Sequence, residues 1–439
     1  MERKVFTTAE EFHSANRELK TELPYSSDTA VLAEPLDLGD RKIPNRLVCQ
    51  AMEGCDGTAD GRPGELTCRR YDRFARGGAG LIWFEATAVM EEGRANPRQL
   101  WIMKENLDSF KRIVEDIRDT AFKANGYEPV IIMQATHSGR YSKPNGVAEP
   151  IIAYNNPIFE KNSPIPPERI ATDEHLDRIG QALVLGAELA EAAGFDGVDI
   201  KCCHRYINSE LLSAHLRPGK YGGSLENRTR LLRESIEGAI QCTSGDFIVS
   251  SRINAYDGFE YPYGFGVREG CGIEFDSAEP SWLIDRLYGL GVRLLNVTMG
   301  NPYFNPHVNR PFAKGGYEIS EHPLEGVKRM LHGTAELKAA RPEMKLICSA
   351  LSYLGVAAPN VAAAFIQKGG FDLAGFGRTI FAYPDFAADV IKTGGLDREK
   401  ICICCSKCSE IMRTPGGTPG CVIRDREVYL PIYKEKCMG

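Results

Sequence analysis

The sequence predicts a (β/α)8 barrel, a fold in which parallel strands alternate with helices. Short apolar runs recur along the chain, and longer amphipathic stretches lie between them. Runs that are apolar on both sides indicate parallel strands covered by helices. Eight such strands close most simply into a barrel, and an open doubly wound sheet is the alternative. The expected strands are Leu47–Ala51, Gly80–Phe84, Pro129–Ala135, Gly197–Ile200, Phe247–Ile253, Leu294–Val297, Leu346–Ser349 and Leu373–Phe376.

Three segments are expected along the chain. Residues 1–30 contain a short helix, from about Thr8 to Thr21, and we expect them to form an extension outside the main core. Residues 31–396 supply the barrel. Residues 397–439 carry a cysteine-rich loop and are predicted to be an appendage. The expected barrel helices include His175–Ala193, Arg228–Gln241, Trp282–Leu290 and Gly326–Ala340.

The composition is that of a globular enzyme. Hydrophobic residues make up 43% and charged residues 26% of the 439 positions, near the averages for folded domains. A net charge of −6 without a Lys/Arg run argues against a nucleic-acid partner. There is no apolar stretch of membrane-spanning length, and the first residues are polar. Fourteen cysteines without an export signal predict reduced thiols and a cytoplasmic protein.

Four cysteines near the C-terminus have the spacing of metal-cluster ligands. Two residues separate Cys402 from Cys405 and Cys405 from Cys408, and twelve separate Cys408 from Cys421. A CxxCxxC run can turn its thiolates toward one centre, and a later cysteine completes the set. Four thiolates suit a 4Fe-4S cluster or a structural zinc, and three in one run favour the cluster. Four unrelated buried thiols are the remaining interpretation.

The ends of the expected strands carry polar residues. Gln134 ends the third run, Lys201-Cys-Cys-His204-Arg-Tyr206 follows the fourth, Arg252 ends the fifth, and Gly375-Phe-Gly377-Arg378 closes the eighth. Chemistry in a barrel collects at this edge. Small residues beside an arginine make a plausible phosphate cradle, although an arginine in such a place is more often in a salt bridge.

Several motifs, in order, resemble the old yellow enzyme family of flavin oxidoreductases, and the resemblance spans about residues 32 to 425. The cysteine spacing is similar to that of its iron–sulfur subgroup, which includes 2,4-dienoyl-CoA reductase and trimethylamine dehydrogenase. YGGSLENR is the most specific motif. The motifs are Asn45-Arg-Leu-Val, Gln134…His137-x-Gly-Arg140, Gly194-Phe-Asp-Gly-Val-Asp-Ile, Tyr221-Gly-Gly-Ser-Leu-Glu-Asn-Arg228 and Gly375-x-Gly377-Arg378.

The resemblance implies an FMN at the C-terminal mouth of the barrel. Gln134 would hydrogen-bond the flavin pyrimidine, and Arg252 would face its N1/O2 edge, where a positive group suits the reduced flavin anion. The subgroup spacing assigns Cys402 and Cys405 as ligands and leaves Cys404 as an extra thiol. Backbone contacts to the ring are implied for Ala51, Met52 and Ala86, and phosphate contacts for Ala350, Leu351, Gly377 and Arg378.

The resemblance also assigns three catalytic positions. Tyr206 falls where the ene-reductases place their proton donor. Lys201 and His204 occupy the pair that grips a carbonyl oxygen, usually His/His or His/Asn, so Lys201 departs from the pattern. It would stabilise an enolate, bind a substrate carboxylate or turn outward. Glu53 replaces a usual Thr or Cys near flavin O4, so it would be protonated or point away. Cys202-Cys203 replaces smaller residues.

Three functions follow from these expectations. The first is reduction of an activated C=C bond in an enoate, enone or enoyl thioester, with Lys201, Arg205 and Arg217 suiting an acid or thioester. The second is an amine dehydrogenase or demethylase, for which Trp83, Tyr256, Tyr303 and Phe304 are candidates for an aromatic cage. The third is an electron-transfer subunit of a larger complex.

The electron source is a further expectation. The iron–sulfur relatives generally continue into dinucleotide-binding domains, and no GxGxxG opens a βαβ unit after the cysteines here. We therefore expect a separate electron carrier, a ferredoxin, a flavodoxin or a reductase subunit, with direct reduction by NAD(P)H as the alternative. A small-molecule substrate and a homo-oligomer are also expected.

Overall fold

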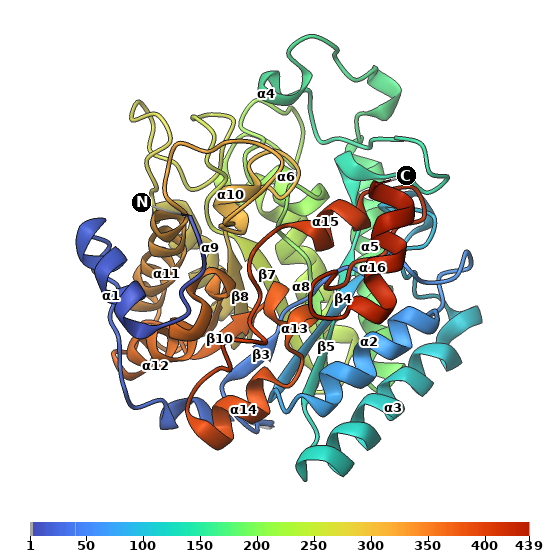
Figure 1. Ribbon diagram of the computed structural model, residues 1–439. Helices are drawn as coiled ribbons and strands as arrows, with labels where there is room; N and C mark the ends of the chain where they lie inside the picture. Colours follow the sequence, from blue (N-terminus) through green and yellow to red (C-terminus); the bar gives the residue numbers. More distant parts are fainter. Residues whose placement is uncertain (1–2, 40, 439) are drawn as a thin grey trace.

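The computed structural model, which describes residues 3–39 and 41–438, is a closed barrel of eight parallel strands (Figure 1). The strand order β10–β3–β4–β5–β6–β7–β8–β9 closes the ring, so the predicted (β/α)8 barrel is confirmed and the open sheet is excluded. The strands are β3 (Leu47–Cys49), β4 (Leu81–Ala88), β5 (Val130–Thr136), β6 (Gly197–Ile200), β7 (Ile248–Asn254), β8 (Leu294–Thr298), β9 (Lys345–Cys348) and β10 (Leu373–Phe376).

Long helices surround the strands (Figure 1). Each of the four helices expected from the sequence is present, with ends that differ by a few residues. The long helices are α2 (Glu65–Arg76), α3 (Leu107–Asn125), α5 (Asp173–Ala192), α8 (Arg230–Cys242), α9 (Ala278–Gly289), α11 (Pro323–Ala340), α12 (Ala358–Gln367) and α14 (Phe386–Thr393). Shorter helices are α4 (Pro157–Glu160), α6 (Ile207–Leu211), α7 (Leu225–Arg228), α10 (Pro306–Asn309) and α13 (Arg378–Ala382). The 3₁₀ turns are Ala30–Ala33, Glu91–Gly93, Lys104–Asn106, Gly139–Tyr141, Pro167–Arg169 and Leu351–Ala357.

The strands read as continuous apolar runs because both of their faces are covered. Every residue of β4, β5 and β6 is buried. Helices cover one face, and the side chains of the other strands cover the second. Polar residues in the strands therefore lie in a water-poor interior and need partners there.

The N-terminal residues pack on the barrel, so the expectation of an extension outside the main core is wrong. Helix α1 (Ala9–Glu18) begins with a capping box between Thr8 and Glu11. Phe12 is fully buried and belongs to the barrel's main hydrophobic core. The carbonyl of Phe6 lies so close to Gly355 that a Cβ there would come within 2.1 Å of it. A short hairpin of β1 (Leu36–Asp37) and β2 (Lys42–Ile43) packs on a second core cluster that contains strand residues.

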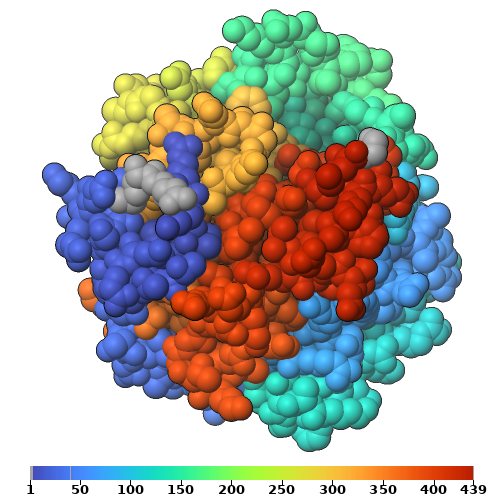
Figure 2. Space-filling model, viewed as in Figure 1, coloured from blue at the N-terminus to red at the C-terminus, as the bar shows by residue number. Residues whose placement is uncertain are grey.

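The C-terminal segment adds two helices, α15 (Lys407–Met412) and α16 (Arg426–Cys437). They pack on each other around a small core of their own, made of Ile411, Val422, Tyr429 and Tyr433. Figure 2 shows this segment, in dark red, as part of a continuous surface with its neighbours. Across the residues that the structure describes, none of the helices has the length and apolar character needed to cross a membrane.

Candidate flavin and substrate site

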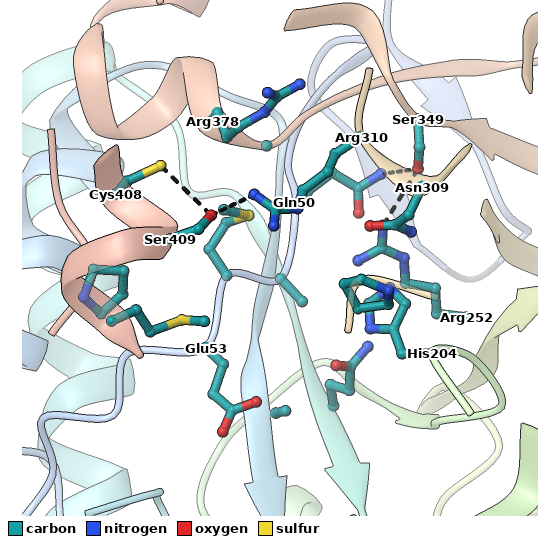
Figure 3. A pocket seen from close by; sticks show the side chains of 18 of the residues that line it. Gln50, Glu53, His204, Arg252, Asn309, Arg310, Ser349, Arg378, Cys408 and Ser409 are labelled. Atoms are coloured by element: carbon teal, nitrogen blue, oxygen red, sulfur yellow. Dashed lines mark hydrogen bonds between the residues drawn. The ribbon is translucent and has the colours of Figure 1, made fainter. Parts of the chain in front are cut away.

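A cavity opens where the strands end at their C-terminal edge. Residues from several barrel strands and from the C-terminal cysteine segment meet around it. Figure 3 shows side chains that line it, with Cys408 and Ser409 on one side and Arg252 and His204 on the other. Its lining residues include Gln50, Ala51, Met52, Glu53, Ala86, Gln134, Lys201, His204, Tyr206, Arg252, Tyr303, Asn309, Arg310, Ser349, Ala350, Ser352, Gly375, Gly377, Arg378, Cys408, Ser409 and Arg413.

One buried carboxyl, Asp199 on β6, holds the floor of the cavity together. It accepts hydrogen bonds from Gln134 Nε2 at 2.6 Å and from Trp83 Nε1 at 2.7 Å. Its other oxygen accepts from the backbone N–H of Arg252 at 2.6 Å. Burial raises the pKa of Asp199, and these hydrogen bonds oppose the shift. The network fixes the side chain of Gln134 and the backbone at Arg252, two residues that line the cavity.

A second polar group lies beside it. Gln50 Nε2 donates to Ser349 Oγ at 3.1 Å, and Asn296 Nδ2 donates to Gln50 Oε1 at 2.7 Å. Arg252 reaches the same serine, with Nη2 3.5 Å from its Oγ. Gly375 is needed here, because a Cβ on it would lie 2.0 Å from Gln50 Nε2. Burial lowers the pKa of Arg252.

The opposite end of the cavity is rich in arginine. Arg378 begins helix α13, and its Nη2 donates to the carbonyl of Pro311 at 2.6 Å. Its Nη1 is buried without a partner among the described residues, so it is free to meet an anion. Ala350 has a φ of 69°, a left-handed conformation that turns the chain sharply after β9. Arg310 donates to Ser409 of the C-terminal segment.

Tyr206 lines the cavity together with a small group of polar and aromatic residues. Its hydroxyl donates to Glu53 Oε2 at 3.2 Å and lies 2.9 Å from the hydroxyl of Tyr303. The ring of Tyr141 stacks on that of Tyr303, with centroids 3.9 Å apart. Burial, and then the charge of Glu53, raise the pKa of Tyr206 well above its usual value. The phenol is therefore protonated at neutral pH.

Lys201 and His204 lie next to Tyr206. The Nζ of Lys201 is 3.8 Å from the centroid of the Tyr206 ring, so it faces into the site. Burial lowers the pKa of Lys201, and burial together with the charge of Arg252 lowers the pKa of His204 well below its usual value. The buried Nε2 of His204 has no partner among the described residues. His204 and Arg205 both have positive φ, a strained turn of the kind found at functional sites.

The cysteines predicted as cluster ligands line one small cavity beside this site. Cys402, Cys405, Cys408 and Cys421 all border it. Cys404 is fully buried and does not border it, although its backbone N–H donates to Cys402 Sγ at 3.4 Å. Arg378, Phe381 and Cys408 border both cavities. Within residues 3–39 and 41–438, no three His, Cys, Asp or Glu side chains are grouped as a single metal ion requires. The four thiols share a cavity without forming a site for a lone ion such as zinc.

Residues 31–265, more than half of the chain, match the family described as "NADH:flavin oxidoreductase / NADH oxidase family". The chain therefore belongs to this family. An "NADPH dehydrogenase" of Geobacillus sp. (strain WCH70) is 33% identical over 244 residues, which cover 54% of this chain and 67% of that protein.

Solved structures of the same fold were also found. A 2-naphthoyl-CoA reductase in complex with 2-naphthoyl-CoA has a TM-score of 0.71 at 19% identity, over 91% of this chain and 57% of that one. An old yellow enzyme homologue from Zymomonas mobilis has a TM-score of 0.62 at 21% identity, over 83% of this chain and 94% of that one. At these identities the likeness shows the barrel fold alone. This chain spans only a little more than half the length of the naphthoyl-CoA reductase.

Within this flavin oxidoreductase barrel, the structure brings nearly all of the predicted site residues together. Leu351 is buried between Ala350 and Ser352 and is not among the lining residues. The sequence interpretation gave no role to Gln50, Ser349 or Asp199, although Asp199 lies in the quoted GFDGVDI motif.

Other residues expected at the mouth lie elsewhere. Arg205 pairs with buried Asp257, and Arg217 pairs with Asp173, so neither lines the cavity and only Lys201 brings the expected charge. Of the four aromatic candidates for an amine cage, only Tyr303 lines the cavity. Trp83 donates to Asp199 inside the barrel, Tyr256 donates to the carbonyl of Ile273, and Phe304 packs on Phe159 and Phe259.

Proposed function

We propose that this chain is an FMN-dependent reductase of activated C=C bonds. The observation that carries the proposal is the position of Tyr206, whose protonated phenol lies in one cavity with Lys201, His204 and the predicted flavin contacts. The other NADH:flavin oxidoreductase relatives use the same fold, but the reaction and substrate of this chain are inferred from its own residues. We infer an enone, enoate or enoyl thioester as substrate class.

The cavity residues fit an FMN. The unpartnered Nη1 of Arg378, together with the turn at Ala350 and Gly377, suits the phosphate, and the helix that begins at Arg378 is too short to supply the site alone. Gln134 and Arg252, held by Asp199, suit the polar edge of the ring. A bound FMN would supply hydride transfer to the substrate.

The residues of the chain would then handle the carbonyl oxygen and the proton. His204 Nε2, buried and without a partner, is available to hydrogen-bond a substrate oxygen. Lys201 would add a positive charge beside it, which stabilises the enolate more strongly than the starting carbonyl. Tyr206 would give its proton to the α-carbon on the side opposite the hydride.

A 4Fe-4S cluster on Cys402, Cys405, Cys408 and Cys421 is part of the proposal. The support is that these four thiols, and not Cys404, border one cavity. This cavity shares Arg378, Phe381 and Cys408 with the proposed flavin site. Such a cluster would pass single electrons to the flavin, after receiving them from a separate carrier protein. In the alternative route, NAD(P)H would reduce the flavin directly. Zinc fits less well, because three of the four cysteines stand in one CxxCxxC run, a spacing more typical of a cluster than of a zinc site.

Amine oxidation is the second candidate. Tyr141, Tyr206 and Tyr303 gather beside the carboxyl of Glu53, a combination that suits a cation. However, the ammonium of Lys201 already occupies the face of the Tyr206 ring, and a second cation there would be repelled. A purely electron-transferring role is the least favoured of the three, because it gives no function to Lys201, His204 and Tyr206, which line the cavity together.

The test is the Tyr206→Phe variant. Reduced enzyme, prepared anaerobically, is mixed with candidate enones, enoates and enoyl thioesters, and flavin reoxidation is followed by its visible spectrum. We expect rapid reoxidation by the wild type with one of these classes and a rate about 10²- to 10⁴-fold lower in the variant, because a general acid contributes about that much. If no alkene reoxidises the wild type while methylated amines bleach the oxidised flavin, the amine assignment replaces ours.

A further inference from the structure

The acid at position 53 has no part in the reaction described so far, yet it touches the proposed proton donor. Glu53 lies just after β3 and Tyr206 just after β6, so the fold brings them together from positions 153 residues apart. Two groups approach the Tyr206 hydroxyl, Glu53 Oε2 at 3.2 Å and the Tyr303 hydroxyl at 2.9 Å. Lys201 approaches the face of the ring instead.

We propose that the Glu53 carboxyl returns a proton to Tyr206 after each turnover, a role that rests on the proposed reductase function. During reduction the β-carbon receives a hydride, and the electron pair of the C=C bond forms a new C–H bond with the Tyr206 proton. The O–H bond of Tyr206 breaks and leaves a phenolate. That phenolate takes the proton of the Glu53 carboxyl across their hydrogen bond. The resulting carboxylate takes up a solvent proton, the one proton that each turnover consumes, and this completes the cycle.

Burial shifts the Glu53 carboxyl toward its protonated form, and its hydrogen bond with Tyr206 is the path for the proton. Burial raises the pKa of Glu53, and the charge of Lys201 and the hydrogen bonds from Tyr206 and Cys55 oppose the shift. Tyr303 faces the same carboxyl and is itself a weak acid, since burial raises its pKa. A carboxyl is the strongest acid that contacts the phenol, so it returns a proton faster than Tyr303 does. Lys201, Tyr206, Tyr303 and Cys55 are the titratable groups that face it.

This role predicts a particular pH dependence. Only the protonated carboxyl has a proton to give, so repeated turnover falls as the pH rises through the pKa of Glu53. Because that pKa is raised, the fall begins above the usual range for a glutamate. In the Glu53→Gln variant this limb of the profile disappears, since a glutamine does not titrate.

The kinetic experiment compares single with repeated turnover in the FMN-loaded protein. Tyr206 begins a single turnover already protonated, so the rate of one flavin reoxidation in Glu53→Gln should stay within about threefold of the wild type. Repeated turnover needs Tyr206 to be protonated again, so the steady-state rate of the variant should fall by about tenfold or more. Glu53→Asp, which keeps a carboxyl, recovers part of the steady-state rate. Equal losses in both measurements would mean that Glu53 only positions Tyr206, and no loss in either would mean that it plays no part. Both results overturn the proposal.

An infrared measurement tests the proton itself without catalysis. The difference spectrum between wild type and Glu53→Gln, recorded at neutral pH without substrate, is expected to contain the carbonyl band of a protonated carboxyl. Glu91→Gln is the matched control, because Glu91 is exposed and should contribute only a carboxylate band. A carboxylate band for Glu53 would overturn the relay. If the wild type reduces no alkene, the reductase assignment itself fails, whatever the infrared result, so the two failures are distinguishable.

Discussion

The mouth of the barrel and the cysteine segment hold their side chains in different ways. At the mouth, Gln134 and Arg252 lie on adjoining parts of a closed sheet, and Asp199 on the strand between them links both. The segment from residue 397 onward has no strand among the described residues. It is attached by side-chain contacts, by backbone N–H groups of Ala313 and Lys314 that donate to the carbonyl of Cys404, and by the packing of Ile401 and Cys404 in the main core. Arg69 and Arg73 on α2 contact Asp425, and Thr418 donates to Asp56.

This contrast predicts that the cysteine segment can open while the barrel stays folded. Backbone pairing around a closed barrel is lost only when the whole domain unfolds, so the mouth is rigid. The segment adds only Ile401 and Cys404 to the buried main core and has no strand pairing to the barrel among the described residues, so we expect it to open at a lower free energy than the barrel itself. The two proposed cofactors, one at the mouth and one in the segment, should therefore be separable by substitution, even though their cavities share Arg378, Phe381 and Cys408.

The largest expected effect comes from a single cysteine. Cys421 borders only the cysteine cavity, so Cys421→Ser should abolish nearly all bound iron and acid-labile sulfide while FMN remains bound. Iron, sulfide and flavin are measured on protein purified and handled anaerobically. The visible absorbance of the cluster is expected to disappear with the iron.

Two controls accompany this variant. Cys68→Ser changes an exposed cysteine on α2 and should keep full iron content. Cys404→Ala changes the buried cysteine that does not border the cavity, and it should keep iron although it lowers stability. Iron that survives in Cys421→Ser but is lost in Cys404→Ala would mean that Cys404 is a ligand, contrary to our assignment.

The second-largest effect is a loss of FMN affinity at the barrel mouth, without a change in the cysteine segment. In Asp199→Asn, the new amide N–H₂ faces the donors of Gln134 and Trp83, which lose a charged acceptor. A hydrogen bond to a charged group contributes about 1.5–3 kcal/mol, so FMN affinity should fall by about tenfold or more as Gln134 and Arg252 lose their fixed positions. The FMN affinity is measured by fluorescence titration of the cofactor-depleted protein with FMN.

A neighbouring carboxyl provides the control. Asp196 precedes β6 at the other end of the barrel and is also buried, where it contacts Arg41 and Arg118. Asp196→Asn should lower the free energy of unfolding without changing the FMN affinity of the folded protein. Equal losses of FMN affinity in the two variants would show that the effect is general destabilisation.

Much of the mouth could be predicted from the sequence, because strand ends in a barrel converge. Once the apolar runs located the strands, Gln134, Lys201, Tyr206 and Arg252 had to face one region, and a family resemblance gave each an expected role. The closed barrel determines which strand ends lie together, and therefore which of these residues can meet. The contact between Glu53 and Tyr206 was not predictable in the same way, since it depends on how two loops bend beyond their strands.

Charges were the least predictable feature. Arg205 sits in sequence between His204 and Tyr206, yet its side chain turns away to buried Asp257, 52 residues later. Which side chain of a strained turn faces the cavity depends on backbone angles that spacing does not reveal, here positive φ at both His204 and Arg205. The packing of Phe12 on the barrel was missed for a similar reason, because an amphipathic helix does not identify its partner.

The smallest effect is expected at the attachment between the two regions. Asp425 is buried and meets two arginines that are each about one-third exposed, so Asp425→Asn should lower the free energy of attachment of the segment by about 1 kcal/mol. Asp72→Asn, which breaks an exposed pair with Arg76 on the same helix, should change it by less than about 0.5 kcal/mol. Hydrogen exchange of α16 measures the difference, and faster exchange should be confined to the segment while β3 to β10 keep their protection. Faster exchange throughout the barrel would mean that the two regions unfold as one unit, and the separability of the two cofactors would then have no structural basis.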